Sequence, residues 1–125
     1  MRQIMDDPKA LALFQEILRK TIAKKLPWQP TAEDDKFVAP MLGKYMLTLL
    51  PYTSRDSWGA PEGPPTITLT DANNNNLAEI HSGIEGVSAQ DLRTVLVFAR
   101  RIAFNADEKI DELLQELQRE DEQRR

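Results

Sequence analysis

The chain contains no cysteine, and this absence removes several kinds of chemistry at once. Disulfide bonds and thiolate nucleophiles are excluded. The sequence has one histidine, His81, and a single histidine cannot build a zinc site. His81 follows a predicted strand, where its neighbour Ser82 would point to the opposite face, so no nucleophile is paired with a base. We therefore expect a protein that is not an enzyme, with no catalytic residues, no metal and no cofactor.

Long apolar runs are also missing from the sequence. No segment reaches the roughly 18 apolar residues that a membrane-spanning helix needs, and the opening MRQIMDDPK has no apolar stretch typical of a secretion signal. We expect a cytoplasmic protein that makes no use of the membrane. The 125 residues suit one domain with one core, and the net charge of −4 disfavours a general attraction to nucleic acid.

The apolar residues that are present follow helical spacing in the first half of the chain. A helix is predicted over residues 8–25, with Leu11, Phe14, Leu18 and Ile22 on one face. A second helix is predicted over residues 32–50, with Thr31 as its N-cap and apolar residues on two neighbouring stripes. Pro40 lies inside this segment and should kink the helix or start a new one there. The width of the apolar surface indicates a helix that is buried on two sides.

Residues 66–82 change to a period of two. Ile67 and Leu69 alternate with threonines, which is typical of a half-buried strand, and the run DANNNN after them predicts a turn. A second short strand, LAEIHS, completes an antiparallel hairpin whose register stays open. A long last helix follows, with Ser88 as its N-cap. The predicted fold is therefore α+β and mainly helical, in the order α-α-β-β-α, with a small antiparallel β-hairpin and a long C-terminal helix.

Residues 51–65 form the main irregular segment and hold four of the eight prolines. Because a tryptophan in such a loop usually packs onto the domain, Trp58 predicts an ordered Ω-like loop that covers the body. The alternative is that Trp58, together with Arg55, belongs to a ligand-binding loop.

The last helix changes character along its length. Apolar residues recur with alternating steps of 4 and 3, which forms a heptad seam. Its members are Leu92, Leu96, Ala99, Ala103, Ala106, Ile110, Leu113 and Leu117. Up to Phe104 the helix is apolar on a second face as well, whereas beyond it the seam is nearly the only apolar surface. We therefore predict a compact domain over residues 1–104, an amphipathic helical extension over 105–119 and a disordered tail over 120–125.

The extension is the predicted site of contact. A helix that is polar and exposed to solvent on all sides except one apolar stripe needs a partner to cover that stripe. The residues expected to make the contact are Ile110, Leu113 and Leu117, with Leu114 at the edge. The partner would be another protein or a second copy in a coiled-coil dimer, unless another segment of the same chain covers the stripe. We expect a non-enzymatic adaptor or assembly module.

A nucleic-acid-binding regulator is the alternative function. Arg93, Arg100 and Arg101 lie on the last predicted helix, and the end of the first helix is basic through Arg19, Lys20, Lys24 and Lys25. These residues would form a patch if the two helices meet. The simpler interpretation of the basic helix end is that its cations complement the helix dipole. The acidic tail also disfavours nucleic acid as a partner.

Overall fold

The structure is a computed structural model that describes residues 7–123. In this range the chain forms three helices, which are α1 (Asp7–Ile22), α2 (Ala89–Ala103) and α3 (Ala106–Gln123). One antiparallel sheet has five strands in the order β1 (Gln29–Pro30), β2 (Phe37–Met41), β3 (Tyr45–Leu50), β6 (Thr66–Asp71) and β7 (Asn76–Ile80). A separate pair, β4 (Ser54–Arg55) and β5 (Pro61–Glu62), lies between β3 and β6 in the sequence.

The predicted order α-α-β-β-α and the mainly helical class are wrong. The chain is 40% helix and 25% strand, and the order is helix, sheet, helices. The error lies in residues 32–50, where β2 and β3 replace the predicted second helix. A run that is apolar at almost every position satisfies both a helix buried on two sides and a pair of strands. Its aromatic and β-branched residues, such as Phe37, Val38 and Tyr45, favour strands, and burial alternates along both of them.

A turn separates these two strands where the helix was predicted to continue. Leu42 and Gly43 both have positive φ angles, 56° and 71°, and the turn is closed by the Lys44 amide, which donates to the Met41 carbonyl at 3.2 Å. Two consecutive positive φ angles suit a hairpin turn and exclude a helix. Pro40 fits β2 because β1 pairs with only Phe37 and Val38, so no outer strand needs its missing N–H.

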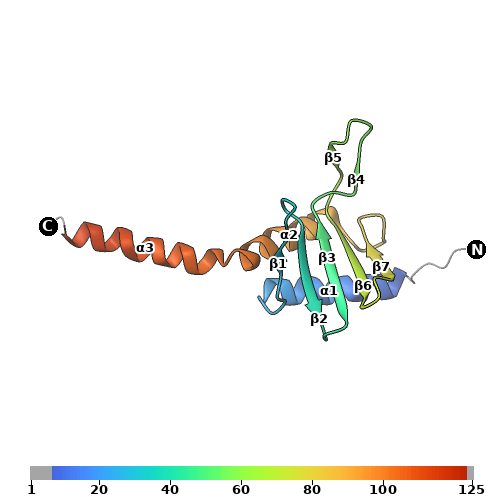
Figure 1. The fold of residues 1–125 in the computed structure, drawn as a ribbon, viewed down its shortest axis with the longest axis horizontal. Coiled ribbons are helices and arrows are strands. Elements are labelled where there is room, and N and C mark those ends of the chain that lie inside the picture. Colours follow the sequence, from blue (N-terminus) through green and yellow to red (C-terminus); the bar gives the residue numbers. More distant parts are fainter. Residues whose placement is uncertain (1–6, 124–125) are drawn as a thin grey trace, which may run out of the picture.

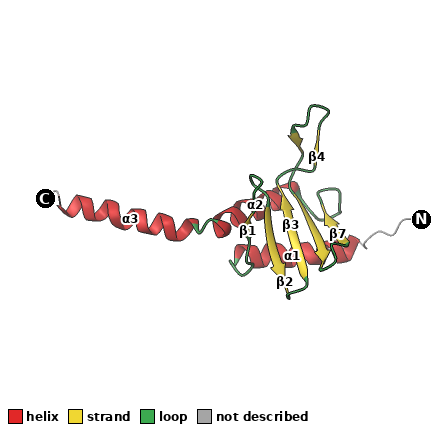
Figure 2. Ribbon diagram, viewed as in Figure 1, coloured by secondary structure: helices red, strands yellow, loops and turns green. Residues whose placement is uncertain are grey.

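The sheet has one covered face and one open face. Helices α1 and α2 lie side by side on the covered face (Figures 1 and 2). One register row across four strands, Phe37, Leu49, Ile67 and Ile80, is at most 1% exposed and forms the centre of the core. The row beside it, Val38, Thr48, Thr68 and Glu79, points to the open face and is partly or fully exposed. This alternation resolves the register of β7, with Ala78 and Ile80 facing inward.

Helix α1 ends three residues earlier than predicted and buries a slightly rotated face. Lys24 has φ 61°, and the Lys25 amide donates to the Lys20 carbonyl at 2.8 Å, which closes a Schellman-type end. The fully buried positions are Ala10, Phe14, Ile17 and Thr21, while Ile22 is half exposed. Inside the core the Trp28 indole N–H donates to the Thr21 hydroxyl at 3.0 Å.

The predicted long last helix is two helices. Ser88 caps α2 as expected, its side chain accepting the Asp91 amide at 3.0 Å. Helix α2 ends at Ala103, and Asn105 has φ 56°, which breaks the helix before α3 begins. The continuous heptad seam therefore does not run along a single helix. Helix α3 continues to Gln123, so residues 120–123 of the predicted disordered tail are helical, and residues 124–125 lie outside the described residues.

Candidate functional site

Helix α3 projects away from the two-layer domain as a long arm (Figure 1). Every described side chain from Glu108 to Asp121 is exposed. Four large aliphatic side chains lie among them, and we call them the α3 stripe. Their exposed fractions are 48% for Ile110, 59% for Leu113, 50% for Leu114 and 50% for Leu117. At 3.6 residues per turn they fall within an arc of about 100°. The structure brings the four sequence-predicted contact residues onto one surface and places nothing from residues 7–123 over them.

Three contacts hold the base of this arm against the domain. The Phe104 ring meets the Phe37 ring edge to face, with centroids 6.0 Å apart. Beside it the Arg100 guanidinium pairs with Asp35 at 2.9 Å. The third contact is at Asp107, in the first turn of α3. An aromatic contact and ion pairs therefore join the region of the α2–α3 junction to the domain.

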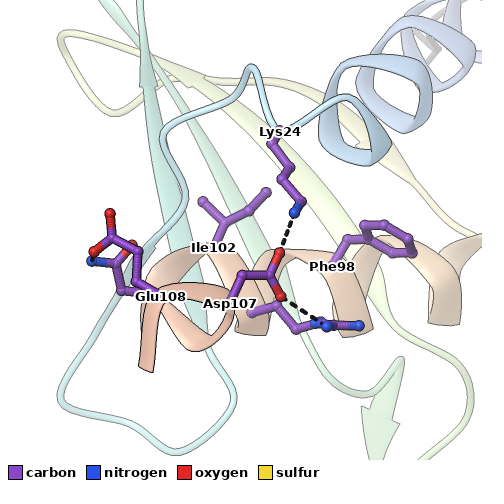
Figure 3. A pocket seen from close by; sticks show the side chains of 7 residues that line it. Lys24, Phe98, Ile102, Asp107 and Glu108 are labelled. Carbon is purple, nitrogen blue, oxygen red and sulfur yellow. Dashed lines mark hydrogen bonds and ion pairs between the residues drawn. The ribbon is translucent and has the colours of Figure 1, made fainter. Parts of the chain in front are cut away.

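Asp107 bridges two cations that come from distant parts of the sequence. One carboxylate oxygen pairs with the Lys24 ammonium group beyond α1, and the other accepts from Arg101 of α2 at 2.8 Å (Figure 3). These two partners, Lys24 first, lower the pKa of Asp107 below its ordinary value. The group lies at a pocket of about 380 Å³ whose apolar wall is formed by Phe98 and Ile102. The carboxylate therefore ties the first turn of α3 to α2 and to the segment that follows α1.

Four of the seven basic residues of the nucleic-acid alternative are paired with carboxylates. Arg100 pairs with Asp35, and Arg101 and Lys24 share Asp107. Arg19 pairs with Glu16 at 2.7 Å. Since the end of α1 and helix α2 do meet, the predicted neighbourhood exists, but acidic partners reduce the positive potential that phosphate groups would require. These ion pairs weaken the case for a nucleic-acid surface.

The 51–65 segment is ordered, but Trp58 does not pack onto the domain. It is 91% exposed near the tip of the β4–β5 hairpin, which extends from the end of the sheet (Figure 1). Asp56 organises the tip by accepting the amides of Trp58 and Ala60, both at 2.9 Å. Arg55 stacks on the Tyr52 ring at 4.6 Å. The predicted lid is wrong because the short strands hold the tip away from the body.

His81 lies in an exposed turn after β7, where its Nδ1 atom accepts the Gly83 amide at 3.0 Å. That hydrogen bond gives it a local structural role. Within residues 7–123 no three His, Asp or Glu side chains come together in a way that could hold a metal ion. None of the helices in this range is both long enough and apolar enough to cross a bilayer.

Sequence reasoning missed the residues that fix the arm, namely Phe104, Asp107 and Asp35. Phe104 could have been found as the last large apolar residue before the polar half of the predicted helix. The acidic partners gave no signal, because their roles depend on which segments the sheet brings together. Comparison with known proteins finds no matching family model and no match among curated proteins or solved structures.

Proposed function

We propose that this protein is a non-enzymatic interaction module that binds another protein through the α3 stripe. The observation that supports this function is the contrast between the two ends of α3. Its first turn is fixed by Asp107, whereas the four aliphatic side chains further along make no use of the domain core. Apolar side chains that recur on one face of an otherwise polar helix are the usual means by which a helix docks onto a partner.

The domain has a definite part in this function. By fixing the α2–α3 junction, it presents the helix in one direction and at a distance from the sheet. A preoriented helix loses less conformational entropy on binding than a free peptide would. The two-layer domain then holds α3 in place and α3 makes the contact, which is the arrangement expected of an adaptor or assembly protein.

Site-specific photo-crosslinking tests this proposal. A photoreactive side chain at Leu113 of the full chain should form adducts in an extract of the native cell, and the same group at Gln115 on the polar side should not. Adding Leu117→Asp to the Leu113 probe should remove the adducts. Equal labelling from both positions, or none from either, would contradict the proposal.

The same variants must keep the fold for the test to count. The side chains of Leu113 and Leu117 are at least half exposed, so the double change Leu113→Asp/Leu117→Asp should alter the free energy of unfolding by no more than about 0.5 kcal/mol. Chemical denaturation followed by circular dichroism measures this. Unfolding of the variant would mean that the stripe is part of the core.

A further inference from the structure

The α3 stripe has an acidic border on both sides. Helix α3 contains eight Asp and Glu residues but only Lys109 and Arg119 as cations, a net charge of −6. With about 100° of rotation per residue, Asp111 lies on one edge of the stripe, and Glu116 and Glu120 lie on the other. Asp121 continues the stripe itself by one further turn. We call Asp111, Glu116, Glu120 and Asp121 the acidic rim, and all four side chains are exposed.

The two cations neutralise only part of this border. Arg119 lies on the side of the helix opposite the stripe, where it pairs with Glu116 at 2.9 Å. Lys109 stands on the Glu116 edge, near the start of the arm. The part of the stripe around Leu113 and Leu117 is therefore surrounded by carboxylates, with cations only at its margin or behind it.

A second copy of α3 is a poor occupant for this surface. If Ile110 and Leu117 take heptad a positions and Leu113 takes d, then Glu116 falls at g and Asp121 at e. The antiparallel register that pairs Ile110 with Leu113 would place Glu116 near Lys109 of the other copy, but between two helices that each carry a net charge of −6. Parallel pairing would place Glu116 opposite Asp121 of the other copy, and the antiparallel register that pairs Leu113 with Leu117 would place Glu116 near its own counterpart. Like charges at these positions destabilise a coiled coil and select against that pairing.

We propose that the occupant of the α3 stripe is a basic amphipathic helix of another protein, with aliphatic residues on one face and Lys or Arg on both sides of that face. This inference rests on the proposed function and adds the chemistry of the partner. The aliphatic faces supply the contact, and the cations face the acidic rim. Complementary charges at the border speed up the encounter and reject acidic partners.

A pair of designed peptides tests the partner's chemistry on the full chain. Both span about three heptads with Leu at a and d, and one has Lys at e and g where the other has Glu. Repulsion among the e and g side chains discourages each peptide from pairing with itself. We expect fluorescence anisotropy to show the Lys peptide binding at least about tenfold more tightly than the Glu peptide, with an affinity that falls as salt is added.

Two matched variants distinguish the contribution of the apolar stripe to peptide binding from the contribution of charge. Leu113→Asp/Leu117→Asp should lose binding of the Lys peptide although the helix becomes more acidic. Gln115→Asp/Arg119→Gln makes the same change in charge on the side opposite the stripe and should retain or strengthen binding. If both variants bind the Lys peptide as tightly as the natural chain does, its attraction is charge alone and the inference is overturned.

The remaining outcomes distinguish this inference from the proposed function. Equal or tighter binding of the Glu peptide, or no binding of either peptide, would overturn the proposal that the partner helix is basic. Light scattering that shows a dimer dissociated by Leu113→Asp/Leu117→Asp would also overturn it, in favour of a second copy. In all three cases the crosslinking contrast between Leu113 and Gln115 decides separately whether the stripe is a contact surface.

Discussion

Leu42 is an aliphatic residue at an exposed, left-handed position in the turn between β2 and β3. Its φ is 56° and its side chain is 83% exposed, so neither the backbone nor the side chain gains from leucine. Asparagine tolerates this conformation far better than leucine does. We expect Leu42→Asn to raise the free energy of unfolding by about 0.5–1 kcal/mol, as measured by chemical denaturation. A destabilised variant would show that Leu42 contributes packing that its exposure does not reveal.

The segment around this turn also shows why a helix was predicted where two strands form. Between Phe37 and Leu50 almost every position is apolar, so helical stripes and strand alternation fit the same residues. Gly43 and Pro40 interrupt this run, and each was compatible with a kinked helix. Where polar residues interrupt the pattern, as the threonines beside Ile67 do, the strand was predicted correctly. The type of element was predicted correctly where its two faces differ in polarity, and wrongly where both faces are apolar.

At the scale of elements, the placement of the four stripe residues was predicted better than the fold around them, while their role in contact stays a prediction. The four stripe residues lie on one exposed surface because helical spacing is a local property. The helix break at Asn105 was missed because the heptad pattern passes across it without a change of step. The contacts of Asp107 with Lys24 and Arg101 depend on tertiary structure, so no local pattern could have predicted them.

The Asp107 bridge should determine how narrowly the direction of α3 is defined. We expect Asp107→Asn to broaden the distance distribution between spin labels on α1 and α3, because the amide keeps the shape but loses the charge that attracts Lys24 and Arg101. Cysteines introduced at Gln15 and Gln118 accept the labels, since the chain has no other cysteine. Asp111→Asn makes the same change one turn further along and should leave the distribution as it was. Equal broadening in both variants would refute the role of Asp107.

The same bridge predicts a dependence on pH with a definite sign. The pKa of Asp107 is lowered from 3.8 by Lys24 and Arg101, so the bridge is complete above that value and is lost only as the pH falls through the lower pKa of the folded state. We therefore expect the label distances to stay constant from neutral pH down to about pH 4 and to broaden below it. Carbon-detected NMR of the Asp107 carboxyl group measures the titration directly. A midpoint at or above 3.8 would contradict the bridge.

At the scale of the whole molecule, the structure divides into a two-layer domain with a buried core and an exposed helix, α3, that projects from it. The core is formed by the sheet with α1 and α2, and its buried side chains end at Ala99 on α2. Beyond Asp107 the described chain adds exposed helix with seven of the chain's 20 acidic residues. If α3 serves contact and not folding, selection on its sequence concerns the partner, while the domain's stability is determined elsewhere.

Truncation tests this division. A chain that ends after Lys109 keeps Phe104, Asp107 and both partners of Asp107 but loses the stripe and the acidic rim. Its free energy of unfolding should lie within about 0.5 kcal/mol of the full chain, because every described side chain from Ile110 to Asp121 is exposed. Ending the chain after Ala103 removes the contact of Phe104 with Phe37 and both Asp107 pairs, so it should be clearly less stable. Denaturant unfolding of the three chains measures both differences. If the longer truncated chain loses several kcal/mol, α3 contributes to the fold and the stripe is not free for a partner.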